Sequence, residues 1–204
     1  MTLGRMSEAT PSAKHQVFTI GHSNQSLEGF VALVKRYHIE LLVDVRSQPY
    51  SKYASQFDAE SIKAALTSQR IRYLFLGREL GGRPADLKHY DAKGYVLYGQ
   101  IARSPAFLSG IAHLEKGASR YRIALMCSEE NPMECHRHLL IGRVLAEKGI
   151  TVSHIRGDGS LQGEAELARD EQPRLPLFEE PEETVWRSVR PVLRREGEPA
   201  SAED

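Results

Sequence analysis

The sequence has no long hydrophobic stretch. Of its 204 residues 41% are hydrophobic, and the apolar runs extend over only a few residues, whereas a helix that spans a bilayer needs about 20 apolar residues in succession. Residues 1–15 also lack the hydrophobic segment of a signal peptide. The sequence therefore predicts a protein with no membrane partner and a cytoplasmic location.

Cysteine is scarce, and charge of one sign is not in excess. Two cysteines are too few for a disulfide framework in a chain of this length, and they indicate free thiols, metal ligands or a catalytic pair. Lys plus Arg and Asp plus Glu both number 27. Because no overall field favours nucleic acid, any contact with nucleic acid is expected to be local.

Glycine-rich phosphate-binding motifs are missing as well. Neither the P-loop pattern nor the dinucleotide fingerprint occurs. The sequence consequently leaves the cofactor unknown, and it leaves the oligomeric state unknown too.

Short apolar runs alternate with segments of helical periodicity. We expect strands over residues 17–21, 41–46, 72–77, 122–127 and 151–155, and helices that begin after Ser26, Asp58, Ser104 and Asn131. This order predicts a Rossmann-like three-layer α/β sandwich around a mainly parallel sheet of about five strands. We expect a flexible tail over residues 1–15, the α/β domain over 16–157, and a polar, mostly disordered tail over 158–204 with a docking segment near 175–190.

Polar residues follow each predicted strand. Ligands of open α/β sheets bind beyond the carboxyl ends of the strands, so we predict a site there for a small anionic or nucleotide-like ligand. The candidate catalytic residues are Cys127, His136, His22 and Asp44, and the candidate ligand-binding residues are Ser23, Arg46, Arg78, Glu79 and Arg137.

Cys127 is the candidate nucleophile. It ends a predicted strand close to the start of the next helix, whose positive end favours a thiolate. The adjacent Glu129 and Glu130 oppose ionisation of the thiol. A buried, unreactive cysteine is the alternative interpretation.

Arg137 and Cys135 are assigned to opposite sides of the helix predicted after Asn131. Arg137 faces the sheet, and as a buried guanidinium it needs a carboxylate or an anionic ligand; Asp44 and Glu79 are the candidate carboxylates. Cys135 is expected to project away from Cys127. This placement, and a spacing of eight positions between the cysteines, argue against a disulfide and against zinc, so no metal ligands are predicted.

Four motifs, taken in order, resemble the domain-of-unknown-function family 488. They are Thr19–Ser23, Leu42–Arg46 with Pro49, Leu76–Arg83, and Met126–Glu130 followed by Pro132 and Cys135–Arg137. The resemblance covers about residues 17–156 and implies an α/β domain of bacterial and archaeal cytosolic proteins in which these motifs line a shared pocket. It implies no particular activity.

Three functions stay open from the sequence. The first is an enzyme that acts on a small ligand through Cys127 with His136 or His22. The second is a module that binds a ligand or a nucleic-acid base without turnover. The third is a sensor of thiol redox state or metal that uses Cys127 and Cys135.

Overall fold

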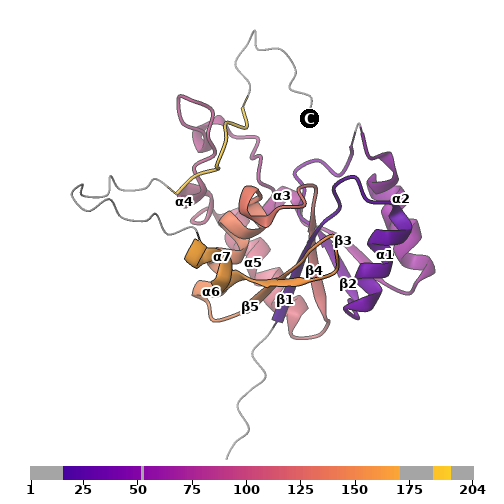
Figure 1. Ribbon diagram of the computed structural model, residues 1–204. Helices are drawn as coiled ribbons and strands as arrows, with labels where there is room; N and C mark the ends of the chain where they lie inside the picture. Colours follow the sequence, from indigo (N-terminus) through magenta and orange to yellow (C-terminus); the bar gives the residue numbers. More distant parts are fainter. Residues whose placement is uncertain (1–15, 52, 171–185, 194–204) are drawn as a thin grey trace, which may run out of the picture.

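The computed structural model in Figure 1 describes residues 16–51, 53–170 and 186–193. Six strands form one sheet in the order β3-β2-β4-β1-β5-β6: β1 (Gln16–Gly21), β2 (Leu41–Asp44), β3 (Arg72–Phe75), β4 (Ile123–Cys127), β5 (Thr151–Ile155) and β6 (Leu161–Gly163). The first five strands pair in parallel, and β6 runs antiparallel to β5. The predicted α/β class is confirmed, with one strand more than expected.

Helices cover both faces of the sheet (Figure 1). On one face α1 (Leu27–Arg36) and α2 (Ala59–Ser68) bury Phe30, Val34, Ile62 and Leu66 against Phe18, Leu42 and Met126 of the strands. On the other face α5 (Pro105–Ala118) and α6 (Arg143–Glu147) bury Phe107, Ile111, Leu114 and Leu145 against Val17, Val43 and Leu125. Side chains alternate along each strand between the two cores, as the period of two requires.

Shorter elements connect these layers. They are α3 (Gly77–Leu80), α4 (Tyr98–Ile101), α7 (Glu164–Asp170), 3₁₀ turns at Ser55–Phe57, Leu87–His89 and Pro132–Glu134, and a π-helix at Arg137–Gly142. None of the helices in the described ranges has the length and hydrophobicity that a bilayer crossing requires.

The sheet has a topological switch at β4, which lies between β1 and β2. The helices that follow β1 and β2 cover one face, whereas those that follow β3 and β4 cover the other. Chain segments that diverge to opposite faces leave a crevice at the carboxyl ends of the strands, where open α/β sheets bind ligands. The ends of β1, β2 and β4 therefore mark the position of a candidate site.

Two predicted helix caps form as expected. The Ser26 hydroxyl accepts from the Gly29 amide at 3.1 Å, and the Ser104 hydroxyl accepts from the Phe107 amide at 3.3 Å. Asp58 precedes α2, but its carboxylate accepts from the Ser51 amide at 2.9 Å instead of from its own helix. The Asp58 side chain therefore bonds the loop after β2 instead of capping α2.

The helix predicted after Asn131 is not continuous. Asn131 caps only the 3₁₀ turn Pro132–Glu134, and Cys135 then adopts an extended conformation with φ −119° and ψ 140°. The π-helix and α6 follow. The expected position of Cys135 on the far side is wrong, because an extended residue breaks the helical phase on which that expectation depended.

The folded chain continues past residue 157. Strand β6 pairs with β5, and α7 buries Leu167 and Glu164. Trp186 lies against the π-helix, where its indole nitrogen donates to the Leu139 carbonyl at 2.6 Å. The predicted tail therefore differs from the structure over 158–170, while residues 1–15 and most of the predicted docking segment lie outside the described residues.

Leu167 provides a test of this boundary. Because its side chain is 1% exposed, Leu167→Ala is expected to lower the free energy of unfolding by about 2–5 kcal/mol. The same substitution at Leu161, which is 48% exposed, is expected to cost less than about 0.5 kcal/mol. Denaturant titration measures both values, and equal effects would mean that α7 contributes no core.

Candidate functional site

The loops after β1 and β4 are bonded to each other. The His22 amide donates to the Cys127 carbonyl at 2.9 Å, and the Ser23 amide donates to the Ser128 carbonyl at 2.8 Å. Gly21 permits this approach, because a Cβ at that position would lie 1.8 Å from the Glu129 carbonyl oxygen. The predicted site residues His22 and Cys127 are thus brought together at the switch point.

A buried ion pair fixes the end of β2. The Arg46 guanidinium donates to both Asp44 carboxylate oxygens, at 2.9 and 2.6 Å, and to the Phe57 carbonyl at 2.8 Å. The Tyr73 hydroxyl of β3 donates to the same carboxylate at 2.8 Å. Asp44 is 0% and Arg46 4% exposed, so a bidentate pair with further hydrogen bonds offsets the cost of burying both charges.

His22 is held as a neutral imidazole beside this pair. Its Nδ1 donates to the Ser23 carbonyl at 2.9 Å, because a carbonyl can only accept, and its Nε2 accepts from Arg46 at 3.2 Å. The ring stacks on Phe57 with 4.4 Å between centroids. Burial and the neighbouring Arg46 charge lower the pKa of His22 to about 4. Both ring nitrogens therefore have partners within the protein.

A compact cluster of sulfur, nitrogen and oxygen donors lies at the end of β4. The Cys127 thiol contacts a Glu129 carboxylate oxygen at 3.0 Å, and the Cys135 thiol contacts the same oxygen at 3.2 Å. Nδ1 of His136 lies 3.7 Å from the Cys127 sulfur and 3.8 Å from the Cys135 sulfur. We call Cys127, Glu129, Cys135 and His136 the thiol cluster.

His136 is oriented by its other nitrogen. Nε2 lies 3.0 Å from the Val45 carbonyl and must donate to it, so Nδ1 of the neutral ring presents a lone pair to both sulfurs. A Cβ at Gly82 would lie 2.7 Å from this ring, so only glycine fits against it. Val45 after β2 and Gly82 after α3 therefore set the orientation of His136, which belongs to the segment after β4.

The thiol cluster perturbs the ionisation of its members. A hydrogen bond from Cys135, acting against the cost of burial and helped by His136, lowers the pKa of Cys127 to about 7. Burial raises the pKa of Cys135. Although burial opposes ionisation of Glu129, the bond from Cys127 and the nearby His136 lower its pKa to about 2. Although burial also opposes the imidazolium, the Cys127 thiolate raises the pKa of His136.

Arg137 is fully buried, with partners that differ from those expected. Its guanidinium donates to the Thr19 hydroxyl at 3.3 Å and to the Glu130 carbonyl, while its main-chain amide lies 3.5 Å from the Cys135 sulfur. The predicted pairing with Asp44 or Glu79 is wrong, because Asp44 is occupied by Arg46, Glu79 lies against Gly110 of α5, and the printed partners of Arg137 are Thr19 and Glu130.

A second buried network adjoins Arg137. Thr19 and Nδ1 of His154 lie 2.7 Å apart, and the Glu164 carboxylate bonds Nε2 of His154 and Nδ1 of His138, each at 2.8 Å. This network is not predictable from the sequence pattern, since Glu164 belongs to the segment predicted as a tail and His154 lies inside a strand. The chemistry of its residue types was the only available signal.

The remaining predicted ligand contacts do not converge on the thiol cluster. Arg78 is exposed on α3, and within the described ranges no contact joins it to the cluster. Ser23 takes a left-handed conformation with φ 44° and contributes main-chain bonds to the loop. Ligand contacts of these residues stay predictions.

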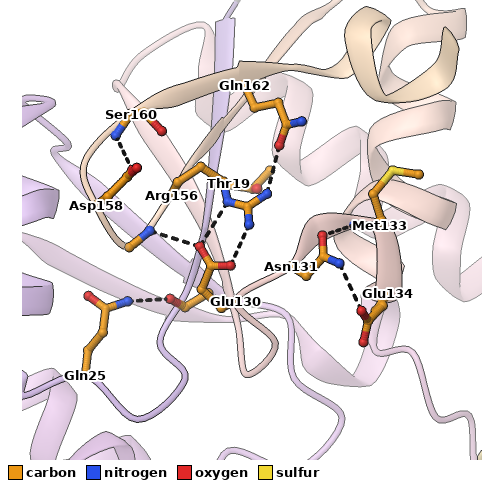
Figure 2. A network of polar contacts seen from close by, with 12 residues as sticks. Thr19, Gln25, Glu130, Asn131, Met133, Glu134, Arg156, Asp158, Ser160 and Gln162 are labelled. Atoms are coloured by element: carbon orange, nitrogen blue, oxygen red, sulfur yellow. Dashed lines mark hydrogen bonds and ion pairs between the residues drawn. The ribbon is translucent and has the colours of Figure 1, made fainter. Parts of the chain in front are cut away.

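A polar surface groove lies next to the site, beside β5 and β6. Figure 2 shows the polar contacts of Glu130, one of its lining residues: both carboxylate oxygens bond Arg156, at 2.9 and 2.6 Å, and Arg156 also donates to Gln162 at 2.8 Å. The groove is lined by Glu130, Arg156, Asp158, Ser160, Leu161, Gln162 and Glu166. Its central charges are thus paired with each other.

The fold and the site define a doubly wound α/β protein with a buried cysteine–histidine centre at the switch point of its sheet. The model of the family described as the domain of unknown function DUF488 matches residues 26–144, and the chain belongs to this family. Comparison with curated proteins and with solved structures gave no match. The predicted family is therefore confirmed, and the activity must be argued from the site.

Asp44→Asn tests the ion pair at the end of β2. The substitution leaves the buried Arg46 without a counter-charge, and we expect a loss of about 3–5 kcal/mol in the free energy of unfolding. Tyr73→Phe removes only one hydrogen bond to the same carboxylate and is expected to cost about 1 kcal/mol. Denaturant titrations that gave similar losses for both variants would contradict this role of the pair.

The pKa of His22 gives a pH dependence. The unfolded chain binds a proton at His22 near the ordinary pKa of 6.5, whereas the folded protein binds it near 4. The stabilisation is complete above pH 6.5 and is lost as the pH falls towards 4, by about 3 kcal/mol in all. His22→Gln should show a smaller loss over this interval. An NMR titration that places the pKa of His22 at 6.5 or above would contradict the assignment.

Proposed function

We propose that this protein is an enzyme whose reaction centre is the deprotonated sulfur of Cys127, and that it acts on a small molecule at the carboxyl edge of β1, β2 and β4. The observation that carries the proposal is the position of that sulfur. It lies at the switch point of the sheet and in contact with Glu129 and His136. A thiolate in such a position serves as a nucleophile or as a metal ligand.

His136, and not His22, is the proton-carrying partner in this proposal. Its Nδ1 faces the Cys127 sulfur at 3.7 Å, and its Nε2 is anchored to Val45. An oriented base beside a thiol is the usual means of activating cysteine. His22 is occupied on both nitrogens by Ser23 and Arg46, so it supports the loop geometry around the thiol.

Arg46 and Arg137 do not indicate a particular charge on the proposed ligand. The Arg46 guanidinium donates its hydrogen bonds to Asp44, Phe57 and His22, and Arg137 is 0% exposed. Neither guanidinium is offered to a ligand at the surface. A small molecule is therefore proposed, and an anionic or nucleotide-like character stays a prediction.

A thiol redox switch is the second candidate, because the Cys127 and Cys135 sulfurs lie within 4.8 Å of each other. Mild oxidation would then join the sulfurs with loss of their two protons and two electrons to the oxidant. Intact-mass measurement before and after treatment with oxidised glutathione distinguishes a disulfide from unchanged thiols, and Cys135→Ser is the control that cannot form it.

Alkylation tests the deprotonated state of Cys127. In reduced, chelator-treated protein, the rate of iodoacetamide labelling at Cys127 is expected to rise with a midpoint near pH 7, well below the ordinary pKa of 9. Cys135 should label more slowly throughout, since its pKa is raised. Peptide mapping assigns the two sites. Cys135→Ser removes the hydrogen bond to Cys127 and should move the midpoint upward, whereas a midpoint near 9 in the wild type would refute the proposal.

A further inference from the structure

Three donors of the thiol cluster, from Cys127, Cys135 and His136, lie close enough together to bind one metal ion. With metal–sulfur bonds of about 2.3 Å and metal–nitrogen or metal–oxygen bonds of about 2.0 Å, tetrahedral angles place sulfur about 3.5 Å from nitrogen and from oxygen. The observed sulfur–nitrogen separations are 3.7 and 3.8 Å, and the sulfur–oxygen separations are 3.0 and 3.2 Å. The two sulfurs and Nδ1 of His136 all lie within 4.8 Å of one another, so one ion can bind these three donors, and the Glu129 oxygen lies beside both sulfurs.

The surroundings of these donors match those of a metal site. Nδ1 of His136 presents its lone pair inward because Nε2 donates to the Val45 carbonyl, which is the usual support for a ligating histidine. The main-chain amide of Arg137 approaches the Cys135 sulfur at 3.5 Å and supports a thiolate there. Both arrangements orient the two donors as a bound metal ion requires.

The negative charge of the thiol cluster also favours a bound cation. Two thiolates and the Glu129 carboxylate would place three negative charges around one point, which a divalent cation relieves. The remaining negative charge is balanced by Arg137, whose guanidinium bonds only the neutral oxygens of Thr19 and Glu130. Arg137 is 0% exposed, and a buried cation without a carboxylate partner requires such a counter-charge.

Glu129 differs from the other three donors in exposure. Cys127, Cys135 and His136 are buried, whereas Glu129 is partly exposed. Three buried protein ligands with a replaceable fourth position form the pattern of catalytic metal sites, while four closed ligands form that of structural ones. Exchange of the Glu129 carboxylate for an oxygen of a small molecule would open the fourth position.

The second network does not share these properties. The Glu164 carboxylate accepts from Nε2–H of His154, so Nδ1 of the neutral ring accepts the Thr19 hydroxyl proton, while the Thr19 oxygen accepts from Arg137. Hydrogen bonds thus account for the contacts of the Glu164 carboxylate with His154 and His138. This network offers two imidazoles and a carboxylate but no thiolate, so it lacks the sulfur ligands of the thiol cluster.

The geometry points to a divalent transition-metal site, best suited to zinc, in which Cys127, Cys135 and His136 are permanent ligands and Glu129 is an exchangeable one. The inference rests on the proposed function and names the cofactor of the same centre; in the metal-bound protein Nδ1 of His136 binds the ion instead of carrying a proton. Binding forms two sulfur–metal bonds as the two thiol protons pass to solvent, with no change of oxidation state. Two thiolates with an imidazole in tetrahedral array favour zinc over magnesium or calcium.

Metal analysis and cobalt substitution test the site. Full-length protein purified under reducing conditions is expected to carry one zinc per chain. After removal of zinc by a chelator, Co²⁺ titration should give thiolate-to-cobalt charge-transfer bands and tetrahedral d–d bands at the same stoichiometry. Cys135→Ser and His136→Gln should weaken Co²⁺ binding by about 10- to 100-fold or more. Circular dichroism checks that each variant is folded.

Two further variants distinguish the alternatives. His154→Gln alters an equally buried histidine of the second network and should keep one cobalt with an unchanged spectrum. Glu129→Ala should keep the stoichiometry and shift the d–d bands, because solvent takes the fourth position. Loss of metal in His154→Gln but not in Cys135→Ser would overturn the site, and complete loss in Glu129→Ala would overturn the exchangeable role of that residue.

The outcome separates this inference from the proposed function. Wild-type protein with neither bound zinc nor cobalt–thiolate bands, but with a Cys127 alkylation midpoint near pH 7, would refute the metal site and leave the thiolate enzyme standing. Bound metal together with a midpoint near 9 in the chelated protein would refute the spontaneously ionised thiol and leave the metal site standing.

Discussion

The buried Asp44–Arg46 pair is the interaction on which the geometry of the site depends. It joins three strands, because Tyr73 of β3 bonds the carboxylate while His22, after β1, bonds the guanidinium. It also holds the Phe57 carbonyl, so the loop after β2 is tied to the same point. A pair of charges that is fully desolvated tolerates little displacement, since each lost hydrogen bond leaves charge unpaired in a medium that solvates it poorly. The ends of β1, β2 and β3 and the loop after β2 are held together for this electrostatic reason.

The path of the chain after β4 brings the residues of the thiol cluster together. Cys127 ends the central strand β4, and the short 3₁₀ turn after Asn131 returns the chain to the sheet edge within eight residues. The extended conformation of Cys135 turns its sulfur towards Cys127, and the π-helix that begins at Arg137 keeps His136 over the Val45 carbonyl. π-helical turns are rare and frequently lie at functional sites. Here the irregular segment allows two adjacent residues to face the same point, which a regular α-helix does not.

The sequence was sufficient for features that depend on local chemistry. Ser26 and Ser104 cap their helices because a serine hydroxyl satisfies free amides in any fold, and the apolar period placed five strands correctly. Cys135 was misplaced because helical phase was extended through a residue whose conformation is set by tertiary contacts. The end of the domain was placed too early for a related reason: β6 has three residues, and its stability comes from pairing with β5, which leaves no periodic pattern to read. The partners of buried charges, such as those of Arg137, also depend on distances in the folded protein. The spacing of residues along the chain does not give these distances.

Arg137 couples the two buried networks of the protein. Its main chain contacts the Cys135 sulfur, and its side chain donates to Thr19. The Thr19 hydroxyl accepts from Arg137 and donates to Nδ1 of His154, whose Nε2–H donates to the Glu164 carboxylate. Arg137 thus connects the Cys135 sulfur with Glu164 of α7 through Thr19 and His154. The segment after residue 157 is for this reason part of the electrostatic environment of the site, although it supplies no atom to the thiol cluster.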